Sequence, residues 1–292
     1  MEVKVGEGER AYFNGGMEKI ETDSSVLVSS SKYLNHQELR HLIAQEMLRR
    51  NGPDLPTTAF IPEVAQILMM LEDFPQLIEL FEAEKARLPK FREWCDNRSL
   101  SDFKKDDVRH CKPGTLGAAL FHWMETSGYE LDVFYRELVV VNDLTFYLRQ
   151  AALNHDIEHL VTGFGPNHGG EVALLNANMF SRARYFRPEL AAFFNRIQAY
   201  LKAKTIMKDA LHYPEAFALN IEAEFVGASQ AVNWTYPIML ADWRSMIDMQ
   251  MADIRKELGI TPVPAEGLWS DTNRLCDEGD PAYAAPLMEA AE

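Results

Sequence analysis

Cysteine and basic residues are scarce in this chain, and long hydrophobic runs are absent. The 292 residues include three cysteines, Cys95, Cys111 and Cys276, which lie far apart and form no C-x-x-C pair. This spacing argues against a disulfide framework or a cysteine-based zinc knuckle, so we expect a reducing compartment. Acidic residues number 44 against 29 basic ones, for a formal net charge of −15. We therefore expect no nucleic-acid partner, because phosphate recognition draws on clusters of Lys and Arg.

The chain also has little that resembles a targeting or membrane-spanning segment. Met1 to Asn14 mixes acidic and basic residues, unlike a signal peptide or an acid-poor transit peptide. No window reaches the run of roughly 18 apolar residues that a transmembrane helix needs. We expect a cytoplasmic protein whose only membrane contact is peripheral, on the inner membrane.

Apolar residues recur three and four positions apart along most of the sequence, and alternating β-branched runs are few. This periodicity is typical of amphipathic helices. It predicts an all-α fold, in which residues 31–261 form a single multi-helix, bundle-like domain. Residues 1–30 would form an N-terminal arm. Residues 262–292, rich in Pro, Ala and Glu, would form a mobile, loosely packed tail.

Capping and breaking residues predict where several helices begin and end. Asn35 is a candidate N-cap for a helix that runs to about Arg50, Thr115 is a second candidate N-cap, and Gly163 is well placed to end a helix. Pro75 marks a break inside residues 61–85. The other expected helices cover 131–162 in two pieces joined near 142–143, then 171–185, 188–207, 215–232 and 237–258.

Residues 155–171 hold the strongest chemical signal. His155-Asp156-Ile157-Glu158-His159 is followed by eleven residues and then Glu171. Two histidines four positions apart project from one face of a helix. The glycine-rich segment 163–170 must be a loop, which can return Glu171 to them in the first turn of the next helix. Imidazole and carboxylate groups suit a divalent metal ion, and any three neighbours in this set could chelate one. His168, within the loop, is expected to face solvent.

Two other metal chemistries fit parts of the sequence. His155-x-x-Glu158-His159 matches the inverted zincin pattern, but the chain lacks the long strands of such peptidases. A di-iron carboxylate hydroxylase needs two Glu-x-x-His pairs and two further carboxylates. Glu38 with His41 supplies one pair, Asp156 with His159 an imperfect second, and Glu222 and Glu224 could supply the rest.

His155-Asp156-x-x-His159-x11-Glu171, with Gly163 four residues after the second histidine, resembles the signature of the coenzyme Q biosynthesis protein 4 family. Pro113-Gly114-Thr115-Leu116-Gly117 resembles the turn that precedes a helix in that family. Trp243, Arg255 and Leu258-Gly259-Ile260 resemble its closing helix, so the resemblance covers about residues 30–260. Glu158 and the basic run Ser181-Arg182-Ala183-Arg184 differ from the family pattern, which leaves the exact substrate open.

The resemblance implies an all-α protein, often a homodimer, that works in ubiquinone biosynthesis with other enzymes of that route. It implies a divalent metal, most often zinc, with Fe²⁺ or Mg²⁺ as alternatives, held by His155, Asp156, His159 and Glu171. The implied substrate is a polyprenylated hydroxybenzoate, whose ring carboxyl is removed oxidatively with hydroxylation at that carbon.

On this hypothesis the protein is a metal-dependent decarboxylase in which Asp156 and Glu158 are the candidate catalytic residues. Glu158, on the flank of the cluster, would be a proton shuttle or would anchor a histidine. The competing hypothesis is a scaffold that binds the metal without turnover and presents lipid intermediates to partner enzymes. Four closed ligands would favour the scaffold, whereas three ligands with an open position would favour the enzyme.

Overall fold

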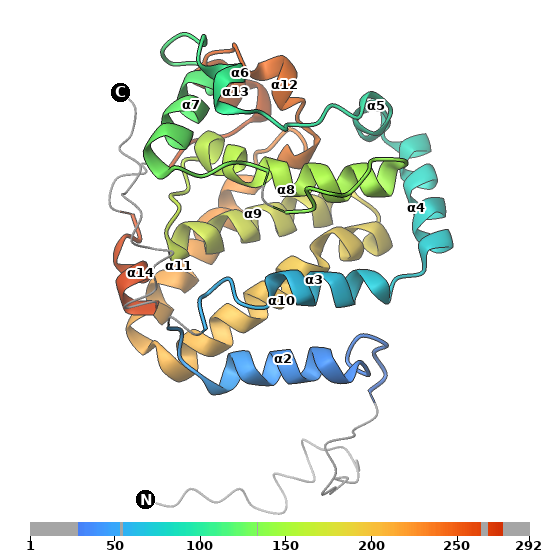
Figure 1. The fold of residues 1–292 in the computed structure, drawn as a ribbon, viewed down its shortest axis with the longest axis vertical. Helices are drawn as coiled ribbons and strands as arrows, with labels where there is room; N and C mark the ends of the chain where they lie inside the picture. The colour runs from blue at the N-terminus through green and yellow to red at the C-terminus, as the bar shows by residue number, and fades with distance from the viewer. Residues whose placement is uncertain (1–28, 53–54, 133, 264–267, 277–292) are drawn as a thin grey trace, which may run out of the picture.

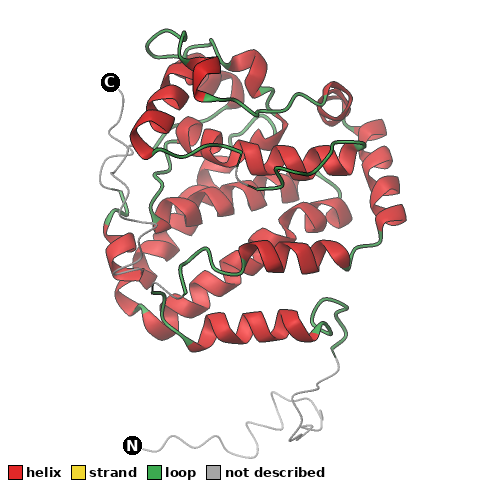
Figure 2. Ribbon diagram, viewed as in Figure 1, coloured by secondary structure: helices red, strands yellow, loops and turns green. Residues whose placement is uncertain are grey.

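Helices make up all the regular elements of the residues described by the computed structural model, which are 29–52, 55–132, 134–263 and 268–276 (Figure 2). The helices are α2 (Gln37–Leu48), α3 (Ile61–Met70), α4 (Phe74–Arg87), α5 (Pro89–Asn97), α6 (Lys105–Val108), α7 (Leu116–Ser127), α8 (Asp143–Thr162), α9 (His168–Tyr185), α10 (Pro188–His212), α11 (Pro214–Ala231), the 3-10 turn η1 (Ile238–Leu240), α12 (Trp243–Met246), α13 (Met251–Leu258) and α14 (Asp271–Cys276). Only two isolated β-bridges accompany these helices in the described residues. The predicted all-α fold is confirmed.

The four longest helices, α8 to α11, form the centre of the molecule (Figure 1). α9 packs most extensively against α11, and then against α10. Gly227 of α11 permits the first of these contacts, because a Cβ at that position would lie 2.0 Å from the carbonyl oxygen of Ala173. On one side, α2 and α3 lie against α10, and on the other side α7 and α13 pack against α8.

Helix α8 is buried on two faces, which fixes the direction of its histidines. Leu153 and Ile157 join a core cluster around Trp243, whereas Phe146 and Tyr147 join an aromatic cluster with Phe91, Trp94 and Phe194. Burying these side chains is the main driving force for folding. Rotation of α8 about its axis would expose one of these two sets of apolar side chains to water. The face of α8 that carries His155 and His159 is therefore held in one direction.

Several predicted helix boundaries are confirmed. The Thr115 side chain accepts a hydrogen bond from the Ala118 N–H and caps α7, and Pro75 lies in the first turn of α4 after a break. Asn142 caps α8, and Gly163 ends it with a left-handed φ of 77°. A Cβ on Gly163 would lie 2.6 Å from the carbonyl oxygen of Val263, so space and conformation both require glycine there.

Other predicted boundaries are wrong. His36 occupies the N-cap position of α2 without a side-chain capping hydrogen bond, and Asn35 instead exchanges hydrogen bonds with Ser29. Residues 131–132 and 134–141 are not helical, and Asp132 in this segment is an ion-pair partner of Arg149. The expected helix 237–258 is divided into η1, α12 and α13, and α12 has its own N-cap in Asp242. Local periodicity did not reveal these tertiary contacts.

The segment expected to be a loosely packed tail has a described part that packs tightly. Trp269 is 5% exposed and Cys276 is 1% exposed, and α14 contacts α9 and α11. The Thr272 hydroxyl accepts a hydrogen bond from the Gly169 N–H. Residues 268–276 therefore belong to the folded unit. The expected N-terminal arm, apart from residues 29 and 30, and residues 264–267 and 277–292 of the expected tail lie outside the described residues.

Candidate metal centre

A tight loop between α8 and α9 brings the histidines and Glu171 together. Asn167 caps α9 by accepting a hydrogen bond from the Gly170 N–H at 2.8 Å. Gly170 cannot carry a side chain, because a Cβ would lie 1.9 Å from the carbonyl oxygen of Gly165. The loop therefore closes more tightly than other residues would allow, and it places Glu171 in the first turn of α9, opposite the last turns of α8.

Three of the predicted residues converge on one point. Nε2 of His155 lies 3.1 Å from Oε2 of Glu171, and Nε2 of His159 lies 3.1 Å from Oε1 of the same carboxylate. The two imidazole rings are 4.7 Å apart between centroids. His155 is 49% exposed and Glu171 39%, whereas His159 is 5% exposed, so the group has a buried side and an open side.

The second nitrogen of each ring has its own partner. Nδ1 of His159 lies 2.9 Å from the carbonyl oxygen of Phe164, which can only accept, so this nitrogen carries a proton. Nδ1 of His155 lies 3.1 Å from Oδ1 of Asp156. Such partners orient metal-bound histidines and leave the Nε2 lone pair for the metal. Both rings are thus set with Nε2 toward Glu171.

This arrangement fits a divalent cation. Two Nε2 lone pairs facing a carboxylate repel it unless a proton or a metal ion lies between them. Nε2 of His159 is buried and makes no hydrogen bond, despite its short distance to Glu171. Partial burial opposes a charge on His155, but Glu171 and Asp156 outweigh it and hold the pKa of His155 well above its ordinary value. The two histidines likewise hold the pKa of Glu171 well below its ordinary value, against the effect of burial. The centre of the group therefore favours positive charge.

Asp156 and Glu158 lie on either side of this group. Asp156 contacts the Nδ1 side of His155, away from the point where the two Nε2 atoms converge. Glu158 is 4% exposed, and its carboxylate accepts a hydrogen bond from the Asn178 amide at 2.7 Å. Burial raises the pKa of Glu158. The structure therefore places Asp156 where it orients His155, and Glu158 in the protein interior.

His168 does not face solvent, as the sequence suggested. It is the first residue of α9 and is 5% exposed. Burial lowers the pKa of His168 to about 4, so it is neutral at ordinary pH. Its side chain lies near Asp209 and Cys276, from two other helices. The expectation was wrong because α14 covers this end of α9.

A cavity of about 670 Å³ opens beside the candidate metal centre. His155, Asp156 and Glu171 form part of its wall. Most of the remaining wall is apolar and comes from α3, α8, α9 and α10. Buried polar residues also line it: Glu158, His168, Asn176, Asn178, Arg182 and Lys204. A large apolar cavity with a few polar groups is the usual form of a small-molecule site.

The described residues do not form the metal site of a di-iron carboxylate hydroxylase or of an inverted zincin. Glu38 and His41 are exposed on α2 and belong to no group of metal-capable side chains there. Glu222 is exposed, and Glu224 pairs with Lys202 at 3.0 Å. The carboxylates of a di-iron site are therefore not assembled. Glu158 is bonded to Asn178, so it is not placed as the general base of an inverted zincin.

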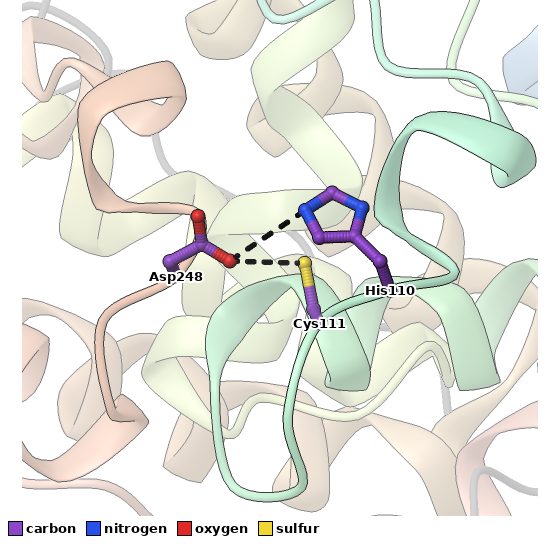
Figure 3. A group of neighbouring side chains, drawn as sticks. All are labelled: His110, Cys111 and Asp248. Atoms are coloured by element: carbon purple, nitrogen blue, oxygen red, sulfur yellow. Dashed lines mark hydrogen bonds and ion pairs between the residues drawn. The ribbon is translucent and has the colours of Figure 1, made fainter.

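A second group of metal-capable residues is formed by His110, Cys111 and Asp248, whose side chains point toward one another in Figure 3. Oδ1 of Asp248 lies 3.4 Å from Sγ of Cys111 and 3.9 Å from Nε2 of His110. His110 and Asp248 are each about 70% exposed. The sequence gave no signal for this group, because Asp248 is 137 positions from Cys111.

Residues 96–264 match the family pattern of the coenzyme Q (ubiquinone) biosynthesis protein Coq4. The chain belongs to the Coq4 family. All four predicted metal ligands lie inside the matched region, and the family places the chain in ubiquinone biosynthesis. The family resemblance found in the sequence is thus confirmed.

The Coq4 fold is also similar to a solved crystal structure from Nostoc punctiforme, of a protein whose name refers to ubiquinone biosynthesis. The two chains are 24% identical, and the TM-score is 0.51 over 70% of this chain and 94% of the other. At this identity the similarity supports the fold alone. No curated protein matches the chain. No helix in the described residues is both long and apolar enough to cross a bilayer.

Proposed function

We propose that this Coq4-family chain is a metal-dependent enzyme that oxidatively decarboxylates a polyprenylated hydroxybenzoate during ubiquinone biosynthesis. One observation carries the proposal: two histidine Nε2 atoms and the Glu171 carboxylate converge at the wall of a large, mostly apolar cavity. The cavity suits the apolar part of such a substrate, and the three side chains suit a divalent ion such as Zn²⁺, Fe²⁺ or Mg²⁺.

The arrangement of the ligands favours an enzyme over a scaffold. His155, His159 and Glu171 converge, while Asp156 contacts the opposite nitrogen of His155. Three protein ligands leave an open position for a substrate oxygen, as in catalytic sites. A bound divalent ion would supply Lewis-acid stabilisation of negative charge on that oxygen.

The side chains around the metal centre would orient its ligands, exclude water and transfer a proton. Asp156 and the Phe164 carbonyl hold both imidazoles in one orientation. The apolar wall of the cavity would exclude water from the aromatic ring of the substrate. Glu158, whose pKa is raised by burial, would exchange a proton with the substrate beside its aromatic ring. The overall change consumes dioxygen and two electrons with two protons from a reductant. It converts the ring carboxyl to a hydroxyl and releases carbon dioxide and one water.

The proposal includes a peripheral membrane contact, because polyprenylated precursors partition into lipid, and a homodimer. α11 presents exposed apolar side chains, of which Phe225 is 73% and Ile221 42% exposed, and either contact could cover them. Co-sedimentation with liposomes and analytical ultracentrifugation separate the two. A Phe225→Ser variant should weaken whichever contact this face makes and leave the other unchanged.

The test of function is complementation in a host that lacks its own Coq4-family protein. The wild-type gene should restore ubiquinone, and His155→Ala should not. The host should then accumulate a precursor that still carries its ring carboxyl, as measured by mass spectrometry. Accumulation of a precursor that has already lost the carboxyl would refute the decarboxylase proposal.

A second measurement separates the enzyme from the scaffold. Purified, metal-loaded protein is incubated with a prenylated hydroxybenzoate, dioxygen and a reductant, and carbon dioxide is measured. Release that depends on His155 supports the enzyme. Absence of release, together with successful complementation, would favour the scaffold.

A further inference from the structure

The inner wall of the cavity carries a buried arginine that the metal centre does not use. Arg182 lies on α9, is 4% exposed and lines the cavity together with Asn178 of the same helix. Glu171 and Arg182 are eleven positions apart, which corresponds to about 16 Å along a helix at about 1.5 Å per residue. The backbone of Arg182 is therefore far from the metal centre, at the inner end of the cavity. Its long side chain points back toward the start of α9 and so toward the metal centre.

Arg182 has few partners for a buried cation. Its Nη1 donates one hydrogen bond, of 3.2 Å, to the carbonyl oxygen of Phe194. Its Nε is buried without a hydrogen-bond partner, and no carboxylate of the described residues lies within ion-pair distance of it. A guanidinium has five N–H donors and binds carboxylates in a bidentate way. A buried charge with so few partners is costly, unless a ligand provides the missing acceptor.

The neighbouring groups indicate what kind of ligand this is. Oδ1 of Asn178 is buried and accepts no hydrogen bond, so the subsite also offers an acceptor for a hydroxyl or a protonated oxygen. Leu174, Ile197 and Leu201 contribute apolar surface to the same cavity. The ligand should therefore combine an anionic, oxygen-rich group with an apolar body.

The charge at the subsite favours a single negative charge. The two lysines that line the cavity each lie close to a carboxylate: Lys202 is 3.0 Å from Glu224, and Lys204 is 3.2 Å from Glu46. Arg182 is thus the one lining arginine or lysine, among the described residues, without a carboxylate at ion-pair distance; the carboxyl group of Glu158, whose pKa Arg182 lowers against the larger effect of burial, lies beyond that distance and already accepts a hydrogen bond from Asn178. One positive charge matches a carboxylate better than the double charge of a phosphate monoester.

We propose that Arg182 is the anion-binding residue of the cavity and holds the carboxylate of an aromatic acid that carries an apolar chain. The carboxylate pairs with the guanidinium, and the ring lies between Arg182 and the metal centre, where a second oxygen of the ring faces His155 and Glu171. This assignment rests on the proposed function for the identity of the ring, but its binding step needs neither metal nor turnover.

The test measures binding by calorimetry to full-length protein treated with a chelator. The probes are 3-prenyl-4-hydroxybenzoate, the matching 2-prenylphenol without the carboxyl, and a prenyl phosphate. Wild-type protein should bind the acid at least tenfold more tightly than the phenol and more tightly than the phosphate. Arg182→Gln should lose at least tenfold affinity for the acid and keep its affinity for the phenol, which also shows that the cavity has folded. Arg182→Lys should retain part of the preference.

Arg184→Gln is the matched control. Arg184 lies two positions along the same helix, is exposed and donates to the carbonyl oxygen of Val232. The Arg184→Gln variant should bind all three probes with the same affinities as the wild-type protein. Equal binding of acid and phenol by the wild type, or equal loss of both in Arg182→Gln, would overturn the proposal, and a preference for the phosphate would overturn the carboxylate assignment. Selective binding of the acid combined with failed complementation would instead refute the proposed reaction and leave the subsite standing.

Discussion

Of the three groups of metal-capable side chains in the described residues, the one at His155, His159 and Glu171 and the one at His110, Cys111 and Asp248 differ in how their atoms are held. In the first, the ring nitrogens of His155 and His159 that do not face Glu171 each contact a fixed oxygen, and the group borders a cavity. In the second, His110, Cys111 and Asp248 meet on an exposed surface, and neither His110 nor Asp248 has a buried side. Similar ligand types thus lie in two different environments.

This difference shows that closeness of the ligand atoms alone is a weaker criterion for a metal site than the fixed orientation of the side chains that carry them. The backbone around the second group is well ordered by hydrogen bonds, such as the one from the Gly117 N–H to the Ile247 carbonyl. Its side chains, however, can turn into water at little cost, and a metal would have to immobilise them. The first group has its rings already aligned, so binding costs less conformational entropy. We therefore expect a metal at the first group and none at the second.

The largest expected effect is on metal content. Wild-type protein purified without added metal should contain about one divalent ion per chain, and His155→Ala or His159→Ala should contain less than about a tenth of that, since a site rarely survives loss of a ligand. Elemental analysis provides the measurement. His110→Ala is the control at the second group and should keep the full content; a metal-free wild type, or loss of metal in His110→Ala, would break the comparison.

The first turns of α9 and α7, one beside each group, should differ in how well they tolerate an added methyl group at Gly170 and Gly117. Gly170→Ala places Cβ against the backbone oxygen of Gly165, which cannot move alone, so we expect destabilisation by about 3 kcal/mol or more. Gly117→Ala places Cβ 2.3 Å from Sγ of Cys111, which can rotate away, but also 2.9 Å from Cβ of Cys111 and 3.0 Å from the carbonyl oxygen of Ile247, so a smaller cost of about 2 kcal/mol is expected. Chemical denaturation of both variants measures the difference, and equal costs would contradict this account.

The role of Asp156 can be separated from that of a direct ligand. If it orients His155, Asp156→Asn should weaken metal binding by roughly 10- to 100-fold while the stoichiometry at saturation stays the same. Competition with a chromophoric chelator measures both quantities. Asp248→Asn should change neither. Complete loss of binding in Asp156→Asn would show that the carboxylate coordinates the metal itself, as the family resemblance implies.

The smallest expected effect concerns the thiol of the second group. Burial, together with the carboxylate of Asp248, raises the pKa of Cys111 to about 11. At pH 8 it should react with iodoacetamide roughly tenfold more slowly than an ordinary thiol, because few thiolates are present, and the rate should increase as the pH rises. Asp248→Asn should accelerate the reaction. Peptide mapping by mass spectrometry follows Cys111; a fast reaction at neutral pH would mean that this site holds a thiolate ready for metal.

Local sequence was sufficient where the determinants lie close together in the chain. The spacing of His155, His159 and Glu171, with a glycine loop between them, indicated their convergence, because helix periodicity and one tight turn fix their relative positions. The same holds for Thr115 and Gly163 at helix ends. Local sequence failed for residues 131–132, 134–141 and 237–258, whose backbone depends on contacts with distant helices.

The sequence by itself determined the all-α fold, the Coq4 family and the convergence of His155, His159 and Glu171 as one group that could bind a metal. Only the tertiary structure decided that Asp156 contacts the far nitrogen of His155, that His168 and Glu158 are buried, and that Arg182 lines the same cavity as Glu171. The physical reason is that periodicity specifies which face of a helix is apolar, whereas the packing of α8, α9 and α10 determines what each polar side chain on the remaining faces contacts.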